Sequence, residues 1–381
     1  MNFVALKMLL GDRAKYIGLI FAISFSAMLM AHQTSIFWGV MRRTTSQIVD
    51  VKDAAIWVMD PRVKYVDEVQ PLTENDLYRV RGVEGVEWAT RLFKGSAKAK
   101  TPQGGFQAFT IMGFDDSTLV GAPRQMTSGS PADLRKPDSV VIDEDGYRFL
   151  WPGEPFRAGK TLEMNDRRAA IVGIAKSSPP FQPTPVVYTR YSQAVQYVGR
   201  ERNMVSFVLA QPRMGEDVQA VCRRIRERTG LAAMTRDEFI RKTIRYYLRN
   251  TGIPVNFGIT VALAFIVGAV VAGQTFYIFT IENLRQFGAL KAIGVTNARI
   301  TAMILLQALV VGVMGFAVGM GLTAAFFEIT KNISHLRGFY LMWEAMAGTG
   351  ASVLTIIVLA SLLSIRRVLV LEPAYVFRGG N

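Results

Sequence analysis

The sequence predicts a membrane protein with four transmembrane α-helices and a large mixed α/β extracytoplasmic domain inserted between the first and second spans. Half of the 381 residues are hydrophobic and only 19% are charged, and the mean hydropathy is +0.23. Most of the 44 Lys/Arg and 30 Asp/Glu lie within residues 41–250, between two very apolar ends. This segregation excludes a simple soluble protein, and the abundance of apolar residues excludes a disordered chain.

The scarcity of His and Cys excludes several kinds of site. The chain has two His and one Cys, Cys222, so it cannot supply the four N/S ligands of a structural zinc site or form an intramolecular disulfide. A lone Cys of this kind is typical of a small buried apolar residue. The net charge of +14 does not indicate a nucleic-acid partner, because Lys and Arg are interspersed with acidic residues along 41–250 and no aromatic-basic RNA motif is present.

Four stretches without Asp, Glu, Lys or Arg predict the spans: residues 16–41, 251–281, 300–327 and 345–365. Each reaches the roughly 20 residues that a helix needs to cross the hydrocarbon core. Buried core helices of a soluble protein are the weaker interpretation. The first stretch is too long for the apolar part of a signal peptide and lacks a clear cleavage site, which indicates a retained anchor.

The short flanking segments predict the orientation. Segments 1–15, 282–299 and 366–381 are rich in Lys and Arg, whereas loop 328–344 has as many acidic as basic residues. The positive-inside rule therefore places both termini and loop 282–299 in the cytoplasm. Residues 42–250 and loop 328–344 are expected to be extracytoplasmic.

The uncharged spans argue against a pore or an ion-coupled carrier, which usually need charged groups near the membrane midplane. We interpret His32 as an interfacial polar residue and Gln274 and Gln307 as partners in bonds between helices. Pairs of small residues permit close helix approach, at Gly268/Ala272, Ala269/Gly273 and Gly315/Gly319.

Residues 42–250 alternate between strand and helix patterns. One helix is expected to start at Thr73–Asp76 and to end before Gly82, and another to cover 216–228. Asn165-Asp166 predicts a hairpin turn. Residues 95–200 have the character of an insertion into a βαβ-like unit. The expected strands cover 86–93, 107–113, 139–142, 161–164, 169–174 and 205–210.

A capping box at Thr235–Glu238 predicts a helix that ends near residue 250, immediately before span 2. We interpret it as a stalk that continues the span outward, with a bend at Gly252 and Pro254; a solvated amphipathic helix is the alternative. Arg241, Arg245 and Arg249 form a basic row. The residues expected to form the stalk are Ile240, Ile244, Arg245 and Leu248.

Two segments imitate catalytic motifs. Residues 153–161 have one residue too many between their glycines for a P-loop, and Pro155 removes a backbone donor. The acidic run 143–145 is typical of a polar turn. Neither a nucleophile elbow nor a Ser/His/Asp set is indicated, so the chain is expected to be non-catalytic and to bind no cofactor or metal.

Loop 282–299 is short, basic and amphipathic. Phe287, Leu290 and Ile293 recur about every three residues, Gly288 allows close approach, and Gly294 suits a helix end. Such an element is expected to be either a helix that docks on a partner or a plain loop. The candidate docking residues are Glu282, Arg285, Phe287, Gly288, Leu290, Lys291, Ile293 and Gly294.

This loop resembles the signature of FtsX/MacB-type ABC transporter permeases (type VII superfamily), with its apolar-Gly-apolar-Leu-Lys-Ala-Ile-Gly core. Residues 365–378, with Glu372-Pro373-Ala374, are similar to the C-terminal basic segment of that family. The order of one span, a large external domain and three spans also matches over nearly the whole chain. Residues 5–18 most resemble the DevC-like branch. Phe287 departs from the usual aliphatic residue, and Asn283-Leu284 dilutes the basic start.

The resemblance implies a non-catalytic permease subunit of the bacterial inner membrane, with residues 42–250 in the periplasm. It would work as a homodimer with separate ABC ATPase subunits, on which ATP and Mg²⁺ bind. Loop 282–299 would be the coupling helix, and ATP-driven motion would reach the periplasmic domain by mechanotransmission. DevC-like members are expected to pair with a membrane-fusion (adaptor) protein and a TolC-like outer-membrane channel. Gly288→Glu or Leu290→Asp is then expected to uncouple ATP use from transport without preventing folding.

Three functions stay open at this level. The first is export of lipids, peptides or small molecules, with release of lipoproteins as a variant that lacks an adaptor. The second is an FtsX-like transducer that activates a periplasmic cell-wall hydrolase. The third is a membrane-anchored sensor or scaffold without an ATPase. The sequence names neither the substrate nor the surface that meets an adaptor.

Overall fold

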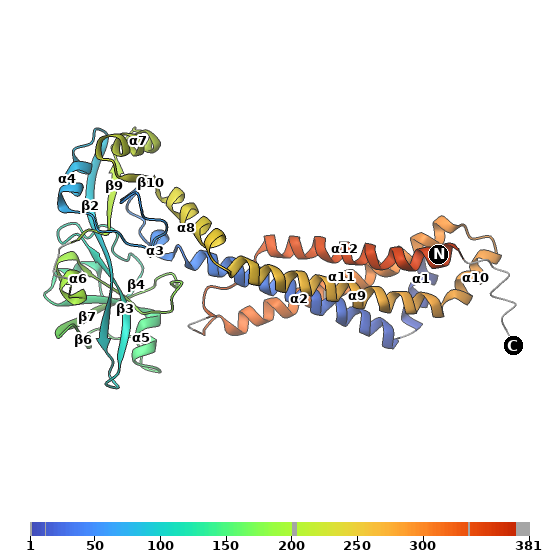
Figure 1. The fold of residues 1–381 in the computed structure, drawn as a ribbon. Helices are drawn as coiled ribbons and strands as arrows, with labels where there is room; N and C mark the ends of the chain where they lie inside the picture. The colour runs from blue at the N-terminus through green and yellow to red at the C-terminus, as the bar shows by residue number, and fades with distance from the viewer. Residues whose placement is uncertain (1, 12, 200–203, 334–335, 371–381) are drawn as a thin grey trace. The chain divides into compact units, whose positions relative to one another are not determined.

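In the computed structural model, which describes residues 2–11, 13–199, 204–333 and 336–370, the chain divides into two compact units. One unit comprises residues 1–39 and 252–381 and the other residues 40–251. Figure 1 shows the first as a group of long helices and the second as a sheet with shorter helices.

Four helices of the described chain are long and apolar enough to span a membrane: α2 (Arg13–Arg43), α9 (Ile253–Glu282), α11 (Asn297–Thr330) and α12 (Trp343–Leu369). The predicted fold class is therefore confirmed, with four such helices and the α/β domain between the first two. Two shorter helices complete this unit, α1 (Asn2–Gly11) and α10 (Leu284–Ala292).

Glycines bring the long helices into backbone contact. A Cβ added at Gly319 of α11 would lie 2.6 Å from the Ser24 carbonyl oxygen of α2, and one at Gly315 would meet the Ile23 side chain at 2.7 Å. Ser26 of α2 donates a 2.7 Å hydrogen bond to the Ala264 carbonyl of α9. Close approach and hydrogen bonds between helices are the usual stabilising contacts in lipid, where helices gain little from the hydrophobic effect. The predicted close packing at Gly315/Gly319 is confirmed.

Gln307 also behaves as the sequence predicts. Its side-chain amide is buried and donates a 2.8 Å hydrogen bond to the Ala5 carbonyl oxygen of α1. This bond joins α1 to α11, and Ala5 and Leu9 of α1 are buried beside it. Gln274, in contrast, is exposed.

The α/β domain is built on one sheet with the strand order β10-β1-β9-β2-β3-β8-β5-β7-β4, and β6 pairs with both β2 and β7. Its strands are β1 (Ile56–Met59), β2 (Val86–Lys100), β3 (Phe106–Phe114), β4 (Met126–Ser128), β5 (Ser139–Asp143), β6 (Thr161–Met164), β7 (Arg167–Ala175), β8 (Val186–Arg190), β9 (Phe207–Pro212) and β10 (Ala232–Thr235). Its helices are α3 (Ser46–Asp50), α4 (Glu74–Arg81), η1 (Pro131–Arg135), α5 (Glu144–Leu150), α6 (Tyr191–Val198), α7 (Val218–Thr229) and α8 (Arg236–Asn250).

The strand order explains the predicted insertion. β1-α4-β2 and β9-α7-β10 are two interleaved βαβ units, because β9 lies between β1 and β2 and is antiparallel to both. The chain between β2 and β9 adds further strands to the edge of β2. There, β6 pairs with β7 and with Ala99 and Lys100 of β2, so that β2, β3, β8, β5, β7 and β6 close into a ring. A closed ring leaves no open edge among these strands.

Strand β1 is buried on both of its faces. In β1, Ile56 and Val58 belong to the core that α4, α5, α6 and α7 cover, whereas Trp57 and Met59 belong to the core that includes α3 and α8. Successive strand residues point to opposite faces, so a strand with two buried faces is apolar throughout. Such a run lacks the alternation that marks a half-buried strand, so the sequence pattern does not predict β1.

Candidate coupling helix, stalk and lateral groove

The segment between α9 and α11 forms a well-defined helix, α10. Its end is a Schellman motif: Gly294 has a φ of +91°, the Gly294 amide donates to the Lys291 carbonyl, and the Val295 amide donates to the Leu290 carbonyl, both at 3.0 Å. Glycine adopts this left-handed conformation without the steric penalty of a Cβ. The sequence prediction of a helix end at Gly294 is confirmed.

One face of α10 packs against the membrane bundle. Phe287 is fully buried, Gly288 is buried, and Leu284 and Leu290 pack at the edge of the same core. Ile293, in contrast, is 78% exposed. Each step of three residues advances about 300° around a helix, so two such steps do not return Ile293 to the face of Phe287. The helix has also ended at Ala292, one residue before Ile293.

Charged side chains connect α10 to α12, and the end of α9 to the start of α2. The Lys291 ammonium donates hydrogen bonds to the carbonyl oxygens of Val368 (2.8 Å) and Leu369 (3.1 Å) at the end of α12. A cation is favourable there because the last carbonyls of a helix carry partial negative charge. Glu282, at the end of α9, pairs with Lys15 at the start of α2. The exposed side chains of this region are Arg285, Gln286, Ala289, Ala292 and Ile293.

The eight candidate docking residues differ in exposure. Four are exposed, namely Glu282, Arg285, Ile293 and Gly294, and Glu282 is also paired with Lys15. The other four pack or bond within the chain, namely Phe287, Gly288, Leu290 and Lys291. Gln286 and Ala289 are also exposed on α10. The sequence pattern does not single them out, because it does not show that Phe287 faces the chain's own bundle.

The helix expected to be the stalk is α8, which begins with the predicted capping box: Thr235 and Glu238 exchange hydrogen bonds with each other's backbone amides. Its buried face comprises Phe239, Thr243 and Tyr247. The predicted stalk residues flank this face: Ile240 and Ile244 are half-buried, and Arg245 and Leu248 are exposed. Thr251, in an extended conformation, separates α8 from α9, so the stalk is a helix of its own.

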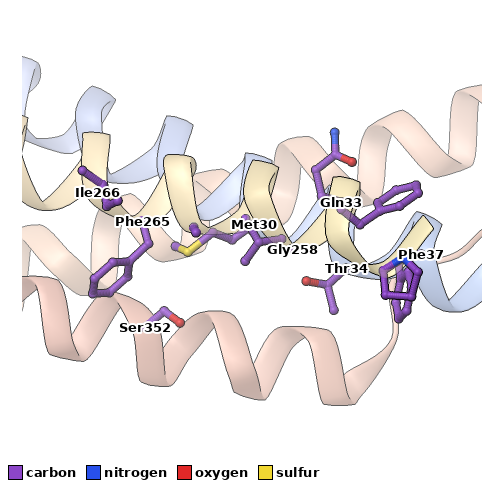
Figure 2. Close-up of a pocket in the computed structure, with 12 residues that line it drawn as sticks. Met30, Gln33, Thr34, Phe37, Gly258, Phe265, Ile266 and Ser352 are labelled. Carbon is purple, nitrogen blue, oxygen red and sulfur yellow. The ribbon is translucent and has the colours of Figure 1, made fainter. Parts of the chain in front are cut away.

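A lateral groove of about 530 Å³ lies between α2, α9 and α12. Figure 2 shows Met30, Phe37, Phe265 and Ile266 among the side chains that line it. Three polar side chains also face it, those of Gln33, Thr34 and Ser352. The groove is thus mainly apolar, in keeping with uncharged spans.

The segments that imitate catalytic motifs have structural roles. Asp143 caps α5: its Oδ1 accepts hydrogen bonds from the amides of Gly146 (3.2 Å) and Val186 (2.9 Å). Residues 153–161 lead into strand β6, not into a helix whose N-terminus could hold phosphate. Within the described residues, no group of three His, Cys, Asp or Glu could hold a metal ion.

Comparison with known protein families decides what this architecture is. Residues 17–228 match the family model of a MacB-like periplasmic core domain, and residues 258–373 match that of an FtsX-like permease C-terminal region. The chain belongs to the MacB/FtsX-type ABC transporter permeases. The resemblance of loop 282–299 to this family is thereby confirmed, whereas most of the second motif, residues 371–378, lies outside the described residues.

The chain is similar to other ABC transporter permeases over between half and four-fifths of its length. It is 28% identical over 315 residues to an uncharacterised ABC transporter permease of Mycobacterium tuberculosis, covering 81% of this chain and 80% of that protein. It is 24% identical over 204 residues, half of each protein, to one of Methanocaldococcus jannaschii. A macrolide export ATP-binding/permease protein MacB of Agrobacterium fabrum is 25% identical over 200 residues, which cover 49% of this chain and 31% of that protein.

Two solved structures resemble part of this permease. The periplasmic region of MacB from Actinobacillus actinomycetemcomitans aligns with 54% of this chain and 96% of its own, at 14% identity and a TM-score of 0.39. The extracellular domain of YknZ, from Gram-positive bacteria, aligns with 48% of this chain and 98% of its own, at 16% identity and a TM-score of 0.35.

The family membership gives the coarse role of the chain. The permease is a multi-pass inner-membrane protein, and its family implies an ATPase partner.

Proposed function

We propose that this chain is the non-catalytic permease subunit of an export system and that it transmits the ATP-driven motion of a separate ATPase to its α/β domain. The observation that carries this proposal is the way α10 is held. Phe287 and Lys291 fix the helix to the bundle, and a strip of exposed side chains from Arg285 to Ile293 faces outward. A docking helix must be rigid on one face and accessible on the other to pass on force.

The residues that line the bundle favour transmission of motion over passage of a substrate through the bundle. The spans lack charged residues between their ends, and the lateral groove is mainly apolar. A polar substrate crossing the membrane would need polar partners along its path. Transmission needs only that the helices move and that the α/β domain responds.

The proposal includes the expected partners and orientation. Both termini and α10 lie in the cytoplasm, where the ATPase binds ATP and Mg²⁺, and residues 42–250 lie in the periplasm. Two copies of the chain form a homodimer. The similarity of residues 5–18 to DevC-like members supports a membrane-fusion (adaptor) protein and a TolC-like outer-membrane channel as further partners.

The test compares two equally exposed isoleucines. Ile293 follows the last residue of α10 and Ile329 lies in the last turn of α11, and each is 78% exposed. We expect Ile293→Asp to reduce co-purification of the ATPase from native membranes and to abolish stimulation of its ATP hydrolysis. Ile329→Asp is the matched control and should behave as wild type.

Two outcomes would overturn the proposal. One is recovery of the intact wild-type chain without any ATPase, repeated in a gentler detergent. The other is equal ATPase binding and stimulation by wild type and Ile293→Asp. Loss of binding in both variants would indicate a general effect of the added charge and would likewise remove the support for α10.

A further inference from the structure

Segment 60–68 of the α/β domain, which connects β1 to the start of α4, lies between the stalk helix α8 and the central strand β2. It makes three different contacts with α8. The Lys242 ammonium donates a 2.6 Å hydrogen bond to the Val63 carbonyl, and the Tyr65 ring stacks on the Tyr246 ring with centroids 4.3 Å apart. Tyr65 also meets the edge of Tyr247 at 5.5 Å. The segment therefore follows α8 over its last two turns.

The same segment is joined to the sheet through one ion pair. The Lys94 side chain of β2 is almost fully buried and its ammonium pairs with the Asp67 carboxylate. It also donates a 3.2 Å hydrogen bond to the Val66 carbonyl. The backbone of Lys94 is fixed in turn, since its amide donates to the Ser206 hydroxyl at 2.8 Å and that hydroxyl donates to the Lys94 carbonyl at 3.1 Å.

Asp67 completes the connection. One of its oxygens accepts from Lys94 and the other accepts a 3.3 Å hydrogen bond from the Tyr247 hydroxyl of α8. A single carboxylate thus joins the central strand to the final turn of α8, which ends at Asn250. Only Thr251 and Gly252 separate that helix from α9. Lysine is among the residues least often buried, and it is retained where a charged partner compensates its desolvation.

We propose that Asp67 is a positioning residue for transmission: it fastens the last turns of α8 to β2, so that a displacement of α8 moves the sheet as one body. This inference rests on the proposed function and adds to it the place where force enters the α/β domain. A hydrophobic contact alone would allow α8 to slide, because apolar packing is not directional. The ion pair and hydrogen bond fix one register between helix and strand.

The test uses variants that leave the ring packing in place. Asp67→Asn removes the charge that holds Lys94, and Tyr247→Phe removes only the hydroxyl that reaches Asp67. Tyr246→Phe is the matched control, because it deletes the neighbouring hydroxyl and keeps the stack on Tyr65. Hydrogen–deuterium exchange of the amides in the last turn of α8 should rise about tenfold in Asp67→Asn and about threefold in Tyr247→Phe, with little change in Tyr246→Phe.

Transmission is read in the full chain assembled with its ATPase in nanodiscs. A donor and an acceptor dye at Met214→Cys in the α/β domain and Ile329→Cys in the bundle report the distance between the two units. Labelled chain is diluted with unlabelled chain, so that each complex carries one labelled copy. We expect ATP to change this distance in wild type and in Tyr246→Phe, and to change it much less in Asp67→Asn and Tyr247→Phe.

The outcomes separate the two proposals. If ATP does not change the distance in wild type, transmission to the domain is wrong. If ATP changes it equally in wild type and in both Asp67→Asn and Tyr247→Phe, transmission stands and the role of Asp67 is wrong. Faster exchange in α8 with an unchanged ATP response would show a purely structural role and would also overturn the inference. If Asp67→Asn does not fold, Tyr247→Phe alone decides.

Discussion

Gly319 of α11 lies directly against the backbone of Ser24 in α2: a Cβ added at Gly319 would lie 2.6 Å from the Ser24 carbonyl oxygen. The same Cβ would lie 2.9 Å from the Cβ of Ala27 and 3.0 Å from the Met28 amide nitrogen. Two of these three atoms belong to the backbone and cannot rotate away. The close approach of α2 and α11 thus depends on the absence of a side chain at Gly319, as it does at Gly315.

Gly319→Ala is therefore expected to destabilise the membrane bundle. Overpacking of a close contact costs about 1–3 kcal/mol, which exceeds the roughly 1 kcal/mol by which Ala favours a helix over Gly. The unfolding midpoint of the purified chain in detergent should fall. Gly321→Ala is the control on the same helix, because an added Cβ there meets nothing within 4 Å. Equal midpoints for the two variants would contradict the close contact.

A second comparison separates folding from docking in α10. Gly288 is buried against the bundle and Ala289, the next residue, is exposed. Gly288→Glu would place a carboxylate in the packed face beside Phe287, where an uncompensated charge is costly. We expect Gly288→Glu to lower the yield and thermal stability of the chain, and Ala289→Glu to leave both unchanged while weakening ATPase binding.

This expectation revises the one drawn from the sequence. The pattern of loop 282–299 indicates an amphipathic docking helix, yet it does not say which apolar residues face the partner and which face the chain's own bundle. A stable Gly288→Glu protein that still fails to stimulate the ATPase would restore the sequence-based interpretation.

Local signals predicted several elements of the α/β domain. The capping boxes at Thr73 and Thr235 mark the starts of α4 and α8, and Asn165 and Asp166 both take positive φ in the turn between β6 and β7. These features depend on neighbouring residues alone, so a sequence pattern contains them.

Features that depend on contacts between distant segments could not be predicted from the sequence. The buried face of α8 lies one residue away from the predicted stalk residues Ile240 and Ile244, because Phe239 packs against Trp57 and Phe207 from two strands. Likewise, the pairing of β6 with β2 joins residues more than sixty positions apart. No periodicity within α8 or β6 could reveal these partners.

The single cysteine should be unreactive in the folded chain. Cys222 is fully buried in α7, and burial raises the pKa of its thiol to about 11. The thiolate is the reactive form, so both access and ionisation disfavour alkylation near neutral pH. A maleimide should label the chain in denaturant and leave it unlabelled in detergent, as read by mass spectrometry. Rapid labelling of the folded chain would contradict the burial of α7 against the sheet.

The two partners of the buried ion pair should differ in their effect on stability. Asp67→Asn leaves the Lys94 ammonium buried beside neutral acceptors alone, the Val66 carbonyl and an amide oxygen. Lys94→Met leaves the Asp67 side chain one-third exposed to solvent and still in contact with Tyr247. Removing one partner of a buried pair costs about 3 kcal/mol or more when the other cannot be hydrated. We expect Asp67→Asn to approach that value and Lys94→Met to cost about 1 kcal/mol.

The pH dependence gives an independent check on the same pair. Burial lowers the pKa of Lys94 below the ordinary lysine value of 10.5, and Asp67 opposes that shift. Without Asp67 the pKa of Lys94 in the folded chain falls further, so the folded state binds fewer protons than the unfolded state between that pKa and 10.5. Stability then rises with pH across this window. The deficit of Asp67→Asn relative to wild type, measured as the shift in unfolding midpoint, should therefore be smaller at about pH 9 than at about pH 7. A deficit that stays constant or grows would show that Lys94 is not the group left without compensation.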